Sequence, residues 1–348
     1  MERLLIFAAC ALCLWSCEEA ELPQAESVPA GVLDVVIDTD LTNEIDDEFA
    51  LAYALLSPER LNVRAIHAAP YSLSPGLVEA GALSELGVRL LILQLETLGL
   101  DLSVTPIREP GPSMESAFER AQEINALMET SVDVRRGSTR FLDGQRVPVE
   151  SEAARNLIAL ARQTREGKLY VVSQGALTNV ASALLLDPSI AERVVVVWTS
   201  AYPSYWPRRN ASFNLVQDVE AARVVFESGA TVVYLPGYFV GEKLRVTRPE
   251  MVEYVQGRGA VGDYLFELYD GHPLFGHYAH SKVIWDMVSV AYLVEPAWFL
   301  DESRAPLTLD ADLRWAPGSG ASVREVLDVD RDRIFRDFYD KLAALGTP

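Results

Sequence analysis

The feature that most constrains the fold is a short apolar run that leads directly into a dense group of carboxylates. Residues 32–37 are rich in β-branched side chains, which is typical of a buried strand. Residues 49–55 carry apolar side chains at helical spacing. Between these two segments lie Asp38, Asp40, Asp46 and Asp47. A strand, a loop and a helix in this order indicate an α/β fold, in which ligands bind beyond the carboxyl ends of the strands.

These four aspartates are candidates for a metal site. Carboxylates this close together repel each other and resist burial unless a cation neutralises them. Oxygen ligands of this kind suit Ca²⁺ or Mg²⁺ better than Zn²⁺. Alternatively, Asp46 and Asp47 stabilise the first turn of the helix, where negative charge is favourable. The alternative leaves Asp38 and Asp40 unexplained, and the sequence alone leaves both interpretations open.

Composition narrows the class of partner. The 348 residues are 49% hydrophobic and 23% charged, as in an ordinary globular protein with an ample core. The net charge of −20 argues against nucleic acid as a partner, because nothing offsets the phosphate charge. No GxGxxG follows the first strand and no GxxxxGK[ST] is present, so dinucleotide and P-loop nucleotide sites lack their main support.

The N-terminus is predicted to be an export signal. Arg3 precedes eleven apolar residues, too few to cross a bilayer and typical of the core of a signal peptide. The end of this segment, LWSC, resembles a bacterial lipobox and predicts cleavage before Cys17 and lipidation of its thiol. We expect a signal peptide at 1–16, a lipidated cysteine and tether at 17–31, and a bacterial protein whose only contact with the membrane of the cell envelope is this lipid anchor. A periplasmic or secreted soluble protein is the alternative.

The rest of the chain alternates predicted strands and helices. Strands are expected at 61–69, 132–137, 168–173, 193–200 and 230–236, and helices at 114–128, 152–164, from 178, and at 219–228. This alternation predicts one domain, residues 32–348, with a mostly parallel sheet flanked by helices on both faces and a helical C-terminal third. Residues 73–111 interrupt the alternation and are interpreted as an insertion.

Asp286 is the unusual residue of the C-terminal third. It lies in an apolar segment, residues 283–293, where an unpaired buried carboxylate would be costly. It is either a capped or salt-bridged residue, or a carboxylate that faces the suspected cation. We favour the second interpretation because a cation is already indicated by the acidic loop.

Four segments together resemble the inosine/uridine-preferring nucleoside hydrolase family. They occur in the family's order and are IDTDLTNEIDDEFALAYAL, VVSQGALTNVASALLLDP, ASFNLVQDVEAARVVFESG and IWDMVSVAYLVEPAWF. The resemblance implies a parallel-sheet α/β domain that holds one Ca²⁺ at the edge of its sheet. It also implies hydrolysis of the N-glycosidic bond of ribonucleosides or a related riboside, through an oxocarbenium-like transition state.

The resemblance also implies roles for individual residues. Asp40 would be a calcium ligand and the base that activates a metal-bound water for attack on the anomeric carbon. The other implied metal ligands are Asp47, Asp286 and the backbone carbonyl of Thr178. Asp46 and Asn214 would bind ribose hydroxyls.

The chain departs from the family pattern at the substrate side of the site. Asp40 and Asp46 are separated by five residues, two more than usual, so that Asn43 or Glu44 could take over a contact. Ser212 stands where the family commonly has a glutamate that grips the sugar, and Trp285 where many members have a histidine that assists the leaving base. Asn43, Ser212 and Trp285 are therefore candidate substrate contacts of altered chemistry.

These observations support two hypotheses of different class. The first is a Ca²⁺-dependent hydrolase that acts on a small riboside or sugar substrate. The alternative is a catalytically inactive, metal-dependent sugar- or nucleoside-binding surface lipoprotein. A metal-dependent phosphoesterase has less support, because no second metal cage or phosphate-binding loop is evident. The sequence is compatible with a homo-oligomer.

Overall fold

The computed structural model describes residues 28–72, 110–142, 144–163, 166–272 and 279–345. Its centre is one sheet, which consists of β1 (Leu33–Thr39), β2 (Leu61–Ala68), β3 (Val134–Arg136), β4 (Leu169–Ser173), β5 (Val194–Ser200), β6 (Thr231–Pro236), β9 (Phe299–Arg304) and β12 (Val323–Val329). The strand order is β3-β2-β1-β4-β5-β6-β12-β9. All neighbours are parallel except the edge pair β12 and β9, which is antiparallel.

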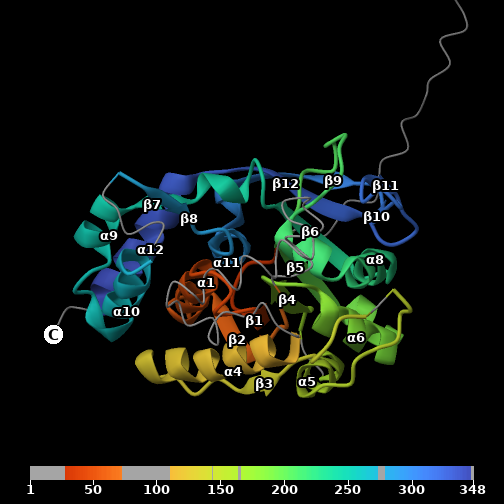
Figure 1. Cartoon of the computed structure of the whole chain (residues 1–348), viewed down its shortest axis with the longest axis horizontal. Coiled ribbons are helices and arrows are strands. Elements are labelled where there is room, and N and C mark those ends of the chain that lie inside the picture. The colour runs from red at the N-terminus through yellow and green to blue at the C-terminus, as the bar shows by residue number, and fades with distance from the viewer. Residues whose placement is uncertain (1–27, 73–109, 143, 164–165, 273–278, 346–348) are drawn as a thin grey trace, which may run out of the picture.

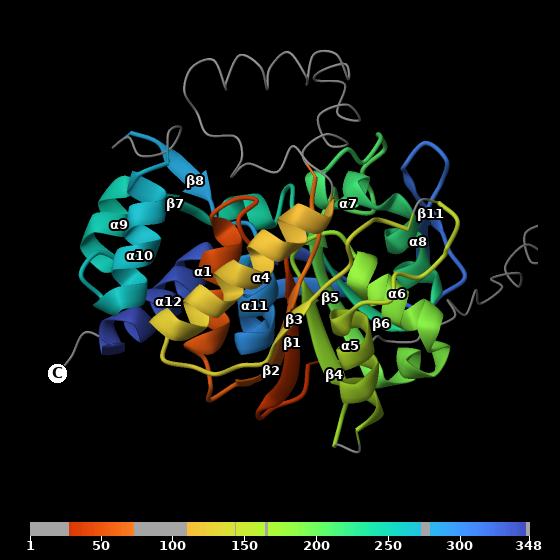
Figure 2. The same cartoon turned by 60° about the horizontal axis from the view of Figure 1, so that its bottom comes forward.

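Helices cover both faces of this sheet, as Figures 1 and 2 show. One face shares a hydrophobic core with α1 (Asp46–Leu55), α4 (Pro110–Leu127), α10 (Gly259–Asp270), α11 (Met287–Val294) and α12 (Arg331–Leu345). The other shares a core with α5 (Glu152–Arg162), α6 (Thr178–Leu186) and α8 (Val219–Glu227). The predicted fold class, a mostly parallel sheet with helices on both faces, is confirmed.

The apolar runs of the strands follow from this double coverage. Successive strand residues point to opposite faces of a sheet. Val36 of β1 accordingly belongs to the core with α5, α6 and α8, and Ile37 to the core with α1 and α11. Both positions are fully buried. Strands of a parallel sheet covered on both faces need apolar residues at every position, which is why β1, β4 and β5 lack polar alternation.

The strand order changes direction between β1 and β4. From β1 the chain adds β2 and β3 on one side, whereas β4, β5 and β6 extend the other side. The carboxyl ends of β1 and β4 are adjacent, and the backbone N–H of Gln174 donates to the backbone carbonyl of Asp38 at 2.8 Å. In an open α/β sheet a crevice forms at such a switch point, and ligands bind there. The acidic loop that follows β1 therefore opens into this crevice.

The C-terminal third contains the expected helices, including α9 (Arg248–Tyr254), but it is not helical throughout. It also supplies β9 and β12 to the main sheet and forms the hairpin of β10 (Leu307–Leu309) and β11 (Trp315–Pro317). Residues 281–283, expected to belong to a helix, form β8 (Ser281–Val283), which pairs with β7 (Arg245–Thr247). These strands carry charged residues because they lie at or near sheet edges, so they lack the apolar run of a central strand.

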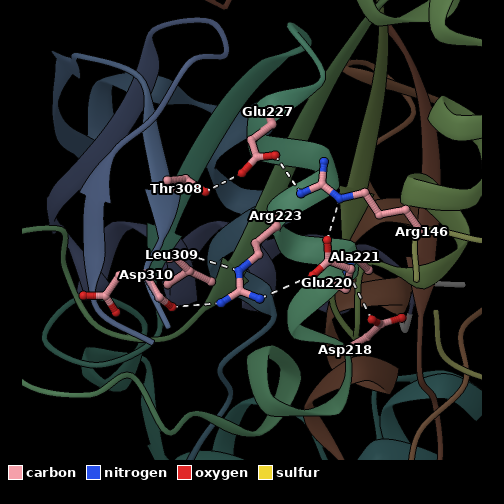
Figure 3. A network of polar contacts seen from close by, with 9 residues as sticks. All are labelled: Arg146, Asp218, Glu220, Ala221, Arg223, Glu227, Thr308, Leu309 and Asp310. Atoms are coloured by element: carbon pink, nitrogen blue, oxygen red, sulfur yellow. Dashed lines mark hydrogen bonds and ion pairs between the residues drawn. The ribbon is translucent and has the colours of Figure 1, made fainter. Parts of the chain in front are cut away.

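A polar network fixes α8 against the β10–β11 hairpin (Figure 3). The Arg146 guanidinium donates to Glu220 at 2.6 Å and to Glu227 at 2.8 Å. Arg223 donates to the Leu309 and Asp310 carbonyls at 3.1 and 2.8 Å. This network holds in place the helix that directly follows the segment containing Asn214.

Two predicted segments lie largely outside the described residues. These are the signal peptide with Cys17 and most of the tether, and the insertion, of which only residues 110 and 111 are described, at the start of α4. Within the described part of the chain, no helix combines the length and apolar character needed to span a membrane.

Candidate metal and substrate site

A pocket lies at the carboxyl edge of the sheet, above the switch point. Its lining comes from the segments that follow β1, β4, β5 and β6, and from the start of α11. The predicted site residues that line it are Asp40, Asn43, Asp46, Asp47, Ser212, Asn214, Trp285 and Asp286. The fold thus brings together, in one pocket, residues from distant parts of the chain.

The acidic loop is shaped by its own contacts. Thr42 adopts a left-handed backbone conformation, with φ of 75°, and its hydroxyl lies 3.0 Å from the Tyr71 hydroxyl. The Asn43 amide donates to the Asp40 carboxylate at 3.3 Å. Helix α1 begins at Asp46, with Asp46 and Asp47 in its first turn and no side-chain cap. Placement in the first turn agrees with both interpretations of these two aspartates, and their surroundings decide between them.

Asp46, Asp47 and Asp286 form a buried carboxylate cluster that fits a hard cation. One carboxylate oxygen of each lies within 4.8 Å of the others, the spacing of ligands that each stand 2.3–2.6 Å from one Ca²⁺. Asp46 Oδ1 is buried and has no hydrogen-bond partner among the described residues. Burial and the neighbouring aspartates raise the pKa of Asp47 and Asp286 well above the ordinary range. A cation would relieve this repulsion, so the donor set fits an oxygen-coordinated metal.

Asp286 occupies the N-cap position of α11 but makes no capping hydrogen bond. Its side chain is 5% exposed and belongs to the carboxylate cluster. Asp286 thus begins α11 without capping it, and its carboxylate lies with those of Asp46 and Asp47.

Asp40 lies beside this cluster, and its carboxylate is closely confined by Gly175. Burial, and then repulsion from Asp46, raise its pKa well above the ordinary range. A Cβ atom at Gly175 would lie 2.9 Å from Asp40 Cγ and 3.0 Å from its Oδ1. The Gly175 carbonyl accepts a hydrogen bond from the Trp198 indole at 3.1 Å, which fixes this turn. Only glycine allows the Asp40 carboxylate its observed position.

We expect Gly175→Ala to lower kcat about 100-fold, the effect of displacing a reacting group by roughly 1 Å. The added methyl group must move Asp40, because the Trp198 hydrogen bond holds the turn itself. Initial rates and the melting temperature, both measured for the variant, would distinguish displacement of Asp40 from unfolding of the protein. A Gly144→Ala variant controls for the glycine substitution, since its Cβ would have no atom within 4 Å, although its φ of +67° adds local strain. A folded Gly175→Ala protein with wild-type kcat would contradict the prediction.

Thr178, whose backbone carbonyl was the implied metal ligand, is not among the residues that line the pocket. Its hydroxyl donates to Asp218 at 2.8 Å. Gln174, four residues earlier and immediately after β4, lines the pocket instead. The Gln174 carbonyl accepts a hydrogen bond from the Asn214 amide at 2.5 Å. The backbone carbonyl of Gln174 is therefore a second candidate ligand from the same turn, beside that of Thr178.

The predicted substrate contacts Asn214, Ser212 and Trp285 line the same pocket. Asn214 is fixed by backbone carbonyls, since its amide also donates to the Thr199 carbonyl at 3.4 Å. The Ser212 hydroxyl lies 2.9 Å from the Ser200 hydroxyl. The Trp285 ring packs edge-to-face against Tyr238, with ring centroids 5.7 Å apart. These residues share one pocket with the carboxylates, as the sequence predicted.

The sequence pattern missed Gln174, Thr199 and Tyr238, which also line the pocket. Each lies within or just after the carboxyl end of a central strand, and that position was the signal that could have identified them. Gln174 Oε1 and Thr199 Oγ1 are buried and have no hydrogen-bond partner among the described residues. They are therefore available to hydrogen-bond a ligand.

Lys282 is a fourth residue that the sequence pattern did not single out. It is 4% exposed, forms an ion pair with Glu44, and lies 4.0 Å from Asp46. Burial opposes its charge, but Asp46 and Glu44 outweigh this effect and raise the pKa of its ammonium group. Lys282 thus anchors the lengthened acidic loop to β8.

Asp38 couples the stability of the metal-free protein to pH. Burial raises its pKa to about 7, although Asn179 and Ser173 donate hydrogen bonds to it. A carboxyl group whose pKa is higher in the folded state binds more protons there. The contribution of Asp38 to the free energy of unfolding is therefore fully present below the unfolded pKa of about 3.9 and is lost as the pH rises toward 7.

We expect Asp38→Asn to reduce this loss by roughly 3 kcal/mol between pH 5 and pH 8, because the amide cannot ionise. Urea unfolding in the presence of EDTA, at several pH values, measures the difference. Equal pH dependence in the wild type and the variant would show that Asp38 does not titrate in this range.

Comparison with known proteins agrees with the geometry of the site. The family model of inosine-uridine preferring nucleoside hydrolases matches residues 35–336. The inosine-uridine preferring nucleoside hydrolase of Crithidia fasciculata is 26% identical over 221 residues, which are 58% of this chain and 68% of that protein. The probable uridine nucleosidase 2 of Oryza sativa subsp. japonica is 29% identical over 170 residues, 47% of this chain and 50% of that protein. The matched region thus spans about half to two-thirds of these curated relatives.

Solved structures support the same fold. A plant nucleoside hydrolase superposes with a TM-score of 0.63 at 19% identity, over 90% of this chain and 99% of that chain. A purine-preferring ribonucleoside hydrolase from Gardnerella vaginalis superposes with a TM-score of 0.59 at 18% identity, with the same coverage. Because the family model extends over most of the sequence, this chain belongs to the inosine-uridine preferring nucleoside hydrolase family.

Proposed function

We propose that the protein is a Ca²⁺-dependent hydrolase of the N-glycosidic bond of ribosides. The observation that carries this proposal is the convergence of Asp46, Asp47 and Asp286 with Asp40 in one pocket. Family membership and the activities named for its relatives support the reaction class. An oxygen-only, acidic donor set supports calcium over softer metals.

The chain offers a defined set of calcium ligands. Asp40, Asp47 and Asp286 would supply carboxylate oxygens, and Gln174 would supply the backbone carbonyl first assigned to Thr178. Calcium, when bound, would orient the ribose hydroxyls and favour the ionisation of a nearby water molecule. The raised pKa values of these carboxyl groups imply that protons compete with the cation, so calcium affinity should fall with decreasing pH.

Asp40 has a second role beside that of a calcium ligand, and Asp46 and Asn214 position the sugar. Asp40 accepts the proton of the water that attacks the anomeric carbon. Asp46, whose Oδ1 has no hydrogen-bond partner among the described residues, accepts a hydrogen bond from a ribose hydroxyl. Asn214 is held by the carbonyls of Gln174 and Thr199 and is thereby oriented toward the ribose.

The test is release of free ribose from inosine, uridine and 4-nitrophenyl β-D-ribofuranoside by protein stripped with EDTA and then titrated with Ca²⁺. We expect ribose release only after calcium is restored. The rate should saturate at one bound ion per protein molecule, a stoichiometry that calorimetry would measure independently. Calcium binding without release of ribose from any riboside would instead favour the metal-dependent binding protein.

A further inference from the structure

Part of the pocket lining is aromatic. Tyr238 and Trp285 both line the pocket. Behind Tyr238 the rings continue as a stack. The ring centroid of Tyr202 lies 4.1 Å from that of Tyr238 and 4.8 Å from that of Trp206, and the Tyr202 ring is nearly parallel to both. We use "aromatic wall" for Tyr202, Trp206, Tyr238 and Trp285. The two rings that reach the pocket are thus supported by further rings outside it.

The aromatic wall is fixed before any ligand arrives. The Tyr202 carbonyl accepts hydrogen bonds from the Tyr234 hydroxyl at 2.6 Å and from the Trp315 indole at 2.9 Å. Two residues further on, the Ser204 amide and hydroxyl each donate to the fully buried Glu325 carboxylate at 2.6 Å. A ligand therefore meets a rigid surface and does not have to order it, which favours binding.

The same pocket carries an excess of negative charge. Five carboxylates line it, namely Asp40, Glu44, Asp46, Asp47 and Asp286, and the lining among the described residues includes no lysine, arginine or histidine. One divalent cation and the Lys282 ammonium would together offset three of these five charges. The pocket would still favour a cationic ligand.

Resting on the proposed function, we infer that the preferred substrates are ribosides whose leaving group is a flat, cationic nitrogen heterocycle of the pyridinium type. Such a ring gains from the faces of Tyr238 and Trp285 through cation–π attraction, and from the surplus carboxylates through Coulomb attraction. A neutral purine or pyrimidine can stack on these rings but gains neither the cation–π attraction nor the Coulomb attraction.

The chemistry of cleavage suits this substrate class. Oxygen of the attacking water bonds to the anomeric carbon while the carbon–nitrogen bond breaks, and Asp40 receives the proton. The electron pair of the broken bond stays on the ring nitrogen and neutralises its positive charge. The heterocycle therefore leaves as a neutral molecule and needs no acid. Burial and the adjacent Tyr202 raise the pKa of Tyr238, the tyrosine of the aromatic wall that lines the pocket, which makes its hydroxyl a poor proton donor.

The experiment compares three substrates on the calcium-loaded full-length protein. N-ribosylnicotinamide is cationic, inosine is neutral, and 4-nitrophenyl β-D-ribofuranoside is a neutral riboside whose 4-nitrophenolate anion is a good leaving group. We expect kcat/KM for N-ribosylnicotinamide to exceed that for inosine at least about 10-fold, with clear hydrolysis of the nitrophenyl riboside. In Tyr238→Leu, kcat/KM for the cation should fall about 10-fold to 30-fold. Tyr238→Phe, which keeps the ring, should retain it.

Each outcome either supports or overturns the inference about the leaving group. Equal or better use of inosine would overturn the inference and leave the proposed function intact. Hydrolysis of the nitrophenyl riboside alone would also overturn it. Failure with all three substrates would overturn the proposed function together with the inference. As a readout independent of turnover, the N-methylnicotinamide cation should inhibit nitrophenyl riboside hydrolysis more strongly than neutral nicotinamide, and equal inhibition would contradict the role of charge.

Discussion

Asp40→Asn is expected to lower kcat for riboside hydrolysis about 10³-fold, within the range that a general base contributes. The side chain is 1% exposed, lies in the pocket beside the carboxylate cluster, and is held close to Gly175. Asparagine has nearly the same shape, so it fits beside Gly175 and keeps one oxygen as a potential metal ligand. It cannot accept a proton from water, however, so the rate of bond cleavage should fall more than calcium affinity.

Asp34→Asn is the matched control for this variant. Asp34 lies on the same strand, β1, but near its opposite end, where it accepts hydrogen bonds from Asn62 and Arg64 and does not line the pocket. Single-turnover rates at saturating Ca²⁺ would give the effect on chemistry. A kcat for Asp40→Asn within about fivefold of the wild type would exclude Asp40 as the base. A wild type that binds ribosides without turnover would support the binding-protein alternative.

Asp47→Asn is expected to weaken calcium binding about 100-fold or more, because calcium affinity depends strongly on the number of charged ligands. Asp47 is 1% exposed, accepts a hydrogen bond from the Thr39 hydroxyl, and belongs to the cluster with Asp46 and Asp286. Calorimetric titration measures the affinity directly. The rise in melting temperature produced by Ca²⁺ should disappear as well, since stabilisation by a ligand requires that the ligand bind.

Glu48→Gln separates the loss of a ligand from the loss of a buried charge. Glu48 is the next residue in α1 and is equally buried, but its carboxylate lies 4.0 Å from Arg120 and does not line the pocket. This variant should bind calcium within about threefold of the wild type, because the ligand charge is unchanged. Similar losses in both variants would mean that calcium binding reports general electrostatics and not coordination by Asp47.

Much of the site followed from short-range patterns. The apolar run of β1 required a strand covered on both faces, and the aspartates after it had to lie at the carboxyl end of that strand. Asn214, Ser212 and Trp285, which were singled out through the resemblance of their segments to one family, line the same pocket. Gln174 lines the pocket and Thr178 does not, because the path of the chain through the turn after β4 decides which residue reaches the pocket.

The sequence by itself therefore determined the parallel α/β architecture and the acidic loop at its carboxyl edge, since both depend on residues close together in the chain. Tertiary structure alone decided which distant groups join that loop. Lys282 pairs with Glu44 across 238 residues, and Asp286 enters the cluster of Asp46 and Asp47 from the start of α11. The aromatic wall likewise draws its rings from the segments after β5 and β6 and from the residue before Asp286. The physical reason is that strand order and helix packing, not sequence spacing, set the distances between these side chains.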